Sequence, residues 1–179
     1  IREGLLQAGT YNDHKTILHF VNSEHLTEAN VAERLKNLDG VVVCPGFGQR
    51  GIEGKLVAIK YTRTNNIPTF GICLGMQMMV IEFARNVLGY KDANSREMDE
   101  KTEHNVIDIM EEQKNITNMG GTMRLGAYEC VLRQNSRVFN IYRQACIHER
   151  HRHRYEFNND FEKEFEENGM MCVGRNPES

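Results

Sequence analysis

The strongest constraint on the fold is a strand–helix–strand pattern between residues 41 and 73. Val41 to Cys44 (VVVC) is a continuous apolar run, as expected of a strand buried on both faces, and Pro68 to Ile72 is a second buried strand. Between them, Ile52 to Asn65 has the apolar spacing of a helix. This βαβ arrangement predicts two parallel strands joined by a right-handed crossover.

The flanking segments extend this unit into a larger α/β domain. We expect a helix at Ile1 to Ala8, a strand at Lys15 to Val21, and a helix that Thr27 caps. The strongest helix pattern is Leu74 to Leu88, which ends at Gly89 and whose predicted apolar stripe comprises Met76, Met79, Val80, Phe83 and Val87. Further strands are predicted over 105–110, 127–132 and 145–157, and a short acidic helix over 160–168. The fold class is α/β: an open, mostly parallel sheet flanked by helices, with additional strands in the second half.

Composition narrows the class of protein. A length of 179 residues predicts a single domain, and 40% apolar with 26% charged residues is typical of a globular protein. The net charge of −3 argues against a general nucleic-acid binder, and no apolar stretch is long enough for a membrane helix. Five widely spaced cysteines and no signal-peptide pattern favour reduced thiols and a cytoplasmic location.

The segment most indicative of chemistry is Gly71-Ile72-Cys73-Leu74-Gly75. Glycines two before and two after a nucleophile define the elbow motif, in which a sharp strand-to-helix turn presents the side chain to solvent. The turn also lies at a helix N-terminus, which favours a thiolate and offers N–H groups to an oxyanion. The alternative, a buried structural cysteine, is less consistent with the predicted strand before Cys73 and amphipathic helix after it.

A glycine-rich loop, Pro45 to Gly51, follows the preceding parallel strand. Its backbone N–H groups around Gly46 are expected at the same sheet edge as Cys73, where they would form half of an oxyanion hole. The alternative is a plain tight turn. The spacing does not match a phosphate-binding P-loop.

The most unusual segment is His148 to Glu156 (HERHRHRYE). In a strand, Arg150, Arg152, Arg154 and Glu156 share one face, and His151, His153 and Tyr155 share the other. The arginines suit a carboxylate or phosphate ligand, and the alternative is a solvated basic edge strand. Histidines two residues apart without nearby cysteine partners do not favour a metal site, so none is predicted.

These motifs together resemble the glutamine amidotransferase domain of CTP synthases, a class I glutaminase. The resemblance rests on CPGFGQRGIEGK (44–55), GICLGMQ (71–77), EFARNVLG (82–89), GGTMRLG (120–126) and RHRHRYE (150–156), which occur in the family's order. GICLGMQ alone indicates only a class I amidotransferase, whereas GGTMRLG followed by RHRHRYE is specific to CTP synthases.

The resemblance implies hydrolysis of L-glutamine to glutamate and ammonia. The ammonia would pass to an N-terminal synthetase domain of the same polypeptide, which aminates ATP-activated UTP to CTP. ATP and Mg would serve that parent enzyme, GTP would be its allosteric activator, and no cofactor is implied for this domain. A homo-oligomeric parent, a tetramer, is also implied.

The resemblance also assigns residue roles. Cys73 would form the γ-glutamyl thioester, and Gly46 and Leu74 would supply the oxyanion-hole N–H groups. The glutamine-binding set would be Leu74, Gly75, Met76, Gln77, Glu97 and Arg154, with Glu97 receiving the substrate ammonium and Arg154 its carboxylate. The segment Gly120 to Gly126 would be the family's mobile lid near the GTP site.

The sequence departs from the family in two places. One glycine precedes Phe47 where the family usually has two, although Gly46 still falls at the oxyanion position. The family's catalytic His and Glu lie in a His-Pro-Glu motif, and 1–179 contains none, so His148, His151 and His153 are not assigned as the base. We therefore expect a single glutaminase domain truncated at both ends, without its first strand or the His-Pro-Glu segment, and inactive by itself. The alternatives are another class I amidotransferase or related elbow-cysteine hydrolase, and a catalytically inactive regulatory or binding module.

Overall fold

Helices and strands alternate along the first half of the chain in the computed structural model, which describes residues 1–109 and 124–177. The elements of this half are α1 (Arg2–Tyr11), η1 (Ser23–His25), α2 (Val31–Arg34), β1 (Val41–Val43), α3 (Ile52–Thr64), β2 (Thr69–Gly71), α4 (Leu74–Phe83) and the π-helical turn η2 (Ala84–Leu88). The second half contributes β3 (Asn94–Ser95), β4 (Asn105–Ile109), β5 (Arg124–Leu132), α5 (Arg137–Tyr142), β6 (Cys146–His153), β7 (Tyr155–Phe157), η5 (Asn159–Phe161), α6 (Glu162–Glu167) and β8 (Gly174–Arg175).

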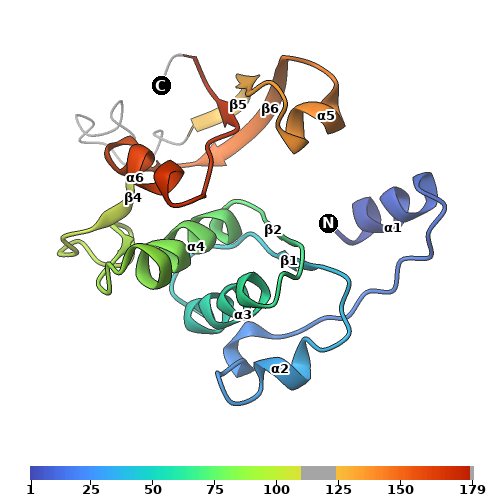
Figure 1. The fold of residues 1–179 in the computed structure, drawn as a ribbon, viewed down its shortest axis with the longest axis horizontal. Helices are drawn as coiled ribbons and strands as arrows, with labels where there is room; N and C mark the ends of the chain where they lie inside the picture. The colour runs from blue at the N-terminus through green and yellow to red at the C-terminus, as the bar shows by residue number, and fades with distance from the viewer. Residues whose placement is uncertain (110–123, 178–179) are drawn as a thin grey trace.

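The predicted βαβ unit is confirmed. β1 and β2 pair in parallel, with Val41 opposite Thr69 and Val43 opposite Gly71, and α3 connects them. Both α3 and α4 pack against these two strands, as Figure 1 shows. This packing places the loop after β1 and the turn after β2 at the same edge of the sheet.

The remaining strands form two further sheets. β3 pairs in parallel with β4, and β4 pairs antiparallel with β7. In the other sheet β5 lies between β6 and β8, antiparallel to both, and Figure 1 shows β5 and β6 beside α5, above the helices of the first half. The α/β class with additional strands in the second half is confirmed, but the predicted single strand over 145–157 is wrong. It breaks at Arg154, because β6 pairs with β5 whereas β7 pairs with β4.

The main core joins the two halves of the chain. Its fully buried side chains include Met78 and Ile81 of α4, Val106 and Ile107 of β4, and Phe165 of α6. Burying side chains of this size stabilises a fold by about 1.5–3 kcal/mol each. The helix that begins at Leu74 is therefore held by elements from both halves.

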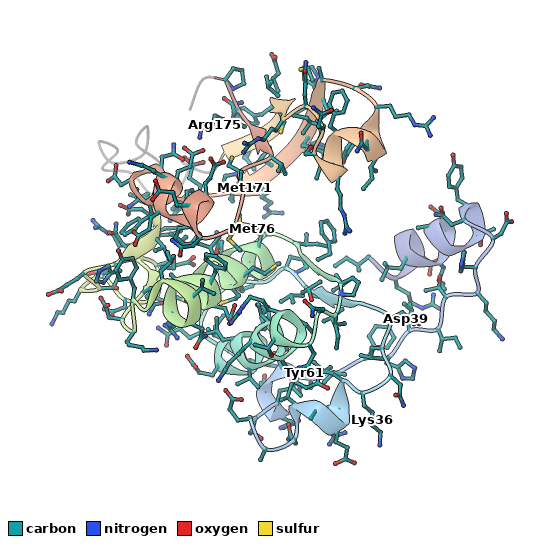
Figure 2. The ribbon with its side chains drawn as sticks, viewed as in Figure 1. Lys36, Asp39, Tyr61, Met76, Met171 and Arg175 are labelled. Carbon is teal, nitrogen blue, oxygen red and sulfur yellow. The ribbon has the colours of Figure 1, made fainter. Side chains whose placement is uncertain are left out.

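A smaller apolar cluster lies between α2 and α3. Leu26, Val31, Leu35 and Ala58 are buried there, and Tyr61 of α3, labelled in Figure 2, packs against them. This contact fixes the outer side of α3 against the N-terminal part of the chain.

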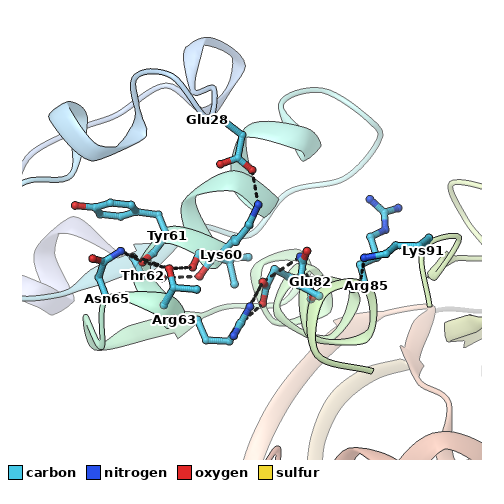
Figure 3. Close-up of polar contacts among 12 residues, drawn as sticks. Glu28, Lys60, Tyr61, Thr62, Arg63, Asn65, Glu82, Arg85 and Lys91 are labelled. Atoms are coloured by element: carbon cyan, nitrogen blue, oxygen red, sulfur yellow. Dashed lines mark hydrogen bonds and ion pairs between the residues drawn. The ribbon is translucent and has the colours of Figure 1, made fainter. Parts of the chain in front are cut away.

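A buried ion pair ties α3 to α4 (Figure 3). The Arg63 guanidinium donates from Nε to Glu82 Oε2 at 2.9 Å and from Nη2 to Glu82 Oε1 at 2.8 Å. Asn86 Nδ2 also donates to Glu82 Oε1, at 3.2 Å. Glu82 is only 1% exposed, so these donors stabilise a carboxylate that has almost no contact with water.

Two sequence predictions before the βαβ unit are also wrong. The segment from Lys15 to Val21 is not a strand, and it pairs with none of the described strands. Thr27 does not cap a long helix: α2 has four residues, its N-cap is Asn30, and the Thr27 N–H donates to the Asn30 side chain.

The predicted stripe on the Leu74–Leu88 helix is confirmed at Val80 and Phe83, which are buried, and is wrong at Met76 and Val87. Met76 is 39% exposed and Val87 is 36% exposed, whereas Leu74, Met78 and Ile81 are buried. The helix is apolar on most sides and packs against α3 and strands of two sheets, so periodicity alone does not select one face.

Candidate active site

Cys73 lies in a strained turn between β2 and α4. Its φ of 53° and ψ of −113° are rare for a residue with a side chain, and it occupies the N-cap position of α4. The Ile72 N–H donates to the Val43 carbonyl and the Gly75 N–H to the Ile72 carbonyl, which fix the turn from both sides. The Cys73 side chain is exposed, as the elbow motif requires of a nucleophile.

The two flanking glycines are required by close backbone contacts. A Cβ on Gly75 would stand 2.0 Å from the Val43 carbonyl oxygen, and one on Gly71 would stand 2.6 Å from the Met76 nitrogen. Real Cβ atoms essentially never approach backbone this closely. The predicted sharp strand-to-helix turn at Cys73 is therefore confirmed. The glycines on both sides of it are needed because any larger residue would clash with the backbone, as predicted from the motif.

The glycine-rich loop lies beside the elbow. The position that a Cβ on Gly46 would occupy is 3.4 Å from Leu74 Cδ2 and 3.7 Å from Lys55 Nζ. The backbone of Gly46 therefore approaches the first residue of α4, whose N–H belongs to the unpaired first turn of the helix. These are the two positions predicted to hold an oxyanion.

The predicted glutamine-binding residues converge around Tyr155. Gln77 of α4 is 5% exposed, and its Nε2 donates to the Tyr155 carbonyl at 3.0 Å. Burial raises the pKa of the Tyr155 hydroxyl, the Glu97 carboxylate raises it further, and the Arg154 guanidinium lowers it. The Gln77 hydrogen bond therefore joins α4 to the backbone of the residue that follows Arg154, and the Glu97 carboxylate acts on the hydroxyl of the same tyrosine through its charge.

A further contact joins the glycine-rich loop to the segment that carries Glu97. Gln49 Nε2 donates to the Met98 carbonyl at 3.2 Å, and the Glu97 N–H donates to Ser95 Oγ at 3.2 Å. Gln49, Tyr155 and Lys55 lie near these predicted positions but are not among the site residues predicted from the sequence. Lys55 had a usable signal, because a side chain in the first turn of a helix leans back toward the loop before it.

The histidines of β6 belong to a different sheet from the elbow. His151 Nδ1 lies 2.8 Å from His153 Nε2, and His151 packs edge-on against Tyr128 of β5. Their same-face placement is confirmed. Of the predicted lid, 120–123 lies outside the described residues, and Leu125 and Gly126 are part of β5.

The described residues contain neither a metal-binding cluster nor a membrane-spanning helix. Over 1–109 and 124–177, no group of three or more His, Cys, Asp or Glu side chains is arranged to hold a metal ion. Within the same ranges, no helix has the length and apolar character needed to cross a membrane.

The comparisons with known proteins agree with this fold and with the position of Cys73. The family model for class I glutamine amidotransferases matches residues 1–178, and the chain belongs to that family. Its relatives include CTP synthases from Bacteroides fragilis, at 73% identity over 179 residues, and from Porphyromonas gingivalis, at 60% over 179 residues. Both matches cover the whole chain, which spans about a third of the length of these curated relatives.

A solved structure supports the same assignment. The glutaminase domain of Trypanosoma brucei CTP synthase, described with bound acivicin, matches with a TM-score of 0.90 and 35% identity. The match covers 97% of this chain and 67% of that chain. The resemblance seen in the sequence motifs is therefore confirmed in both sequence and fold.

Proposed function

We propose that this chain is the glutamine-hydrolysing domain of a CTP-forming ligase. The observation that carries the proposal is the exposed Cys73 on a strained elbow at the N-terminus of α4. The convergence of Gln77, Glu97 and Arg154 around Tyr155 supplies polar groups of both charge signs for an amino-acid substrate.

The chemistry begins with attack of the Cys73 thiolate on the carboxamide carbon of glutamine. A C–S bond forms, the C=O becomes an oxyanion, and the N–H groups of Gly46 and Leu74 donate to it. Collapse of the adduct breaks the C–N bond, and the nitrogen leaves as ammonia after gaining a proton. Water then cleaves the thioester, which gives glutamate and restores the thiol.

The α-ammonium and α-carboxylate groups of glutamine need charged side chains to bind them. We assign its α-ammonium to Glu97 and its α-carboxylate to Arg154, with Leu74, Gly75, Met76 and Gln77 lining the bound glutamine. Arginine suits a carboxylate because its planar fork donates two parallel hydrogen bonds. The base that accepts the thiol proton is not assigned to His148, His151 or His153, because the family's base lies in a His-Pro-Glu motif and residues 1–179 contain none.

The whole-protein activity is part of the proposal. Ammonia released here would aminate ATP-activated UTP in a synthetase domain of the same polypeptide, with Mg as the counter-ion of ATP and GTP as activator. A cytoplasmic homo-oligomer, a tetramer, is the proposed assembly, and neither a membrane nor a nucleic acid is a proposed partner.

The test is CTP formation by the full-length protein with either nitrogen source. Cys73→Ala should abolish synthesis from glutamine and preserve synthesis from free ammonia, and Cys146→Ala is the matched control that should preserve both. Loss of both activities in Cys73→Ala would mean that Cys73 is structural. Ammonia-dependent synthesis without any glutamine-dependent synthesis in the unmodified protein would favour an inactive binding module.

A further inference from the structure

A glutamine side chain joins the glycine-rich loop, 44–51, to the turn that carries Glu97. Gln49 Nε2 donates to the Met98 carbonyl at 3.2 Å, across 49 positions of the chain. The backbone of Gln49 is itself tied to the start of α3, because its carbonyl accepts from the Ile52 N–H at 3.4 Å. The side chain therefore connects the loop that carries one proposed substrate contact to the residue next to another.

The turn that carries Glu97 is held from two sides. The Glu97 N–H donates to Ser95 Oγ at 3.2 Å, and Ser95 is completely buried. Just before Glu97, the Arg96 N–H donates to the Ile107 carbonyl at 3.0 Å, which ties the turn to β4. The hydrogen bond from the glycine-rich loop holds the turn on its other side, at the carbonyl of Met98.

The glycine-rich loop has a separate anchor where it begins. Lys55 Nζ donates to the Cys44 carbonyl at 3.1 Å and lies 3.7 Å from the point where a Cβ on Gly46 would stand. The Phe47 side chain is 92% exposed, so its ring does not pack the middle of the loop against the protein. The loop is therefore held near Gly46 by α3, whereas Gln49 connects its later part to the turn.

We propose that Gln49 is a positioning residue for the α-ammonium site, which sets the distance between Glu97 and the oxyanion loop. The inference rests on the proposed function, since it takes Glu97 as the residue that binds the substrate ammonium. A bound glutamine must reach the oxyanion donors and Glu97 at the same time, so the distance between them is part of substrate recognition. Loss of the Gln49 hydrogen bond leaves Gly46 held by Lys55 but releases the Glu97 turn on the side of the loop.

The test is glutamine-dependent CTP formation by the full-length protein over a range of glutamine concentrations. Gln49→Met keeps the length of the side chain and removes the donor. Gln49→His carries a ring that is neutral at about pH 8 and whose Nε2 can donate at a similar reach. Gln7→Met is the matched control, because Gln7 is an exposed glutamine of α1. Thermal unfolding and ammonia-dependent synthesis check that each variant is folded.

The expected result separates binding from chemistry. Gln49→Met should raise the KM for glutamine roughly two- to tenfold, the size expected for loss of one hydrogen bond, with kcat changed less than about twofold. Gln49→His should restore most of the KM, and Gln7→Met should match the unmodified protein. Hydrogen–deuterium exchange of the peptide that contains residues 94–100 should be faster in Gln49→Met, a readout that needs no glutamine turnover.

Three outcomes would overturn the proposal. They are an unchanged KM in Gln49→Met, a histidine variant as impaired as the methionine variant, and a raised KM with unchanged exchange of residues 94–100. The last would show that Gln49 contacts glutamine directly and does not act through the turn. An unmodified protein that does not use glutamine would instead remove the proposed function, and with it this role of Gln49.

Discussion

Two regions of the molecule hold cysteines in opposite settings. In the elbow unit, defined here as residues 41–83, Cys73 is exposed at a helix N-terminus on a strained turn. In the antiparallel sheet of β5, β6 and β8, burial raises the pKa of Cys130, and a hydrogen bond with Glu129 raises that of Cys146. A raised pKa lowers the thiolate fraction at neutral pH, so the surroundings of Cys130 and Cys146 work against nucleophilic chemistry at these two thiols.

The two regions also differ in how they are braced. The elbow unit contains the Arg63–Glu82 pair, in which the carboxylate is buried. The pairs beside the antiparallel sheet, Arg133–Glu166 and Arg175–Glu162, keep between a quarter and half of each side chain exposed. Exposed ion pairs typically contribute about 0–1 kcal/mol to stability. We therefore expect that breaking the Arg63–Glu82 pair lowers the free energy of unfolding more than breaking either exposed pair.

The largest expected effect comes from adding a methyl group at the elbow. Gly75→Ala places a Cβ 2.0 Å from the Val43 carbonyl oxygen, and backbone cannot yield as a flexible side chain does. We expect the free energy of unfolding to fall by more than about 3 kcal/mol, measured by urea denaturation of the intact protein. Gly4→Ala in α1 is the control, since nothing lies within 4 Å of its Cβ. Equal stability of the two variants would show that the elbow is loosely packed.

The second-largest expected effect tests the Arg63–Glu82 ion pair between α3 and α4. Glu82→Gln leaves the Arg63 guanidinium without its carboxylate, and we expect a loss of about 2 kcal/mol. That figure is below the usual range for a broken buried pair because the Arg63 side chain is 35% exposed. Glu166→Gln in α6, which removes the partner of Arg133 beside the antiparallel sheet, should cost at most about 1 kcal/mol. Similar urea midpoints for the two variants would contradict the contrast between the regions.

A third substitution examines the point where the two regions meet. Arg154 lies between β6 and β7, so it links the antiparallel sheet to the strand that contacts α4. Loss of a charge-assisted hydrogen bond costs about 1.5–3 kcal/mol, so Arg154→Ala should weaken glutamine use by roughly ten- to a hundredfold. Ammonia-dependent synthesis should be unaffected. Unchanged kcat and KM for glutamine would remove Arg154 from the proposed site.

The elbow unit could be predicted from the sequence because its signals are local. The apolar run of β1, the periodicity of α3 and the glycines around Cys73 each act within a few residues. At the turn, the close contacts of Ile72 and Gly75 with Val43 leave little room for another backbone geometry. Local consistency of this kind is what makes a motif informative.

The features that sequence reasoning missed depend on contacts between distant segments. The break in the 145–157 strand at Arg154 follows from two different partner strands, and the buried face of α4 follows from packing on several sides. Lys55 is 11 positions after Cys44, and only the fold brings its Nζ to the Cys44 carbonyl beside the glycine-rich loop. Periodicity contains no information on such tertiary partners.

The smallest expected effect sharpens the comparison of the thiols. The pKa of the Cys146 thiol is raised mainly by its hydrogen bond with Glu129. Burial and the negative charge of Glu129 raise it further. A raised pKa means less thiolate at neutral pH, so Cys146 should reach half of its maximal alkylation rate at a higher pH than a free cysteine. Glu129→Gln removes the negative charge and should move that midpoint to lower pH, measured by mass spectrometry of the Cys146 peptide. Cys130 is the internal control, since burial is the main cause of its raised pKa and should persist in the variant. A Cys146 midpoint that stays in place would show that the carboxylate does not control this thiol, and the contrast with Cys73, which is also exposed, would then rest on the strained turn alone.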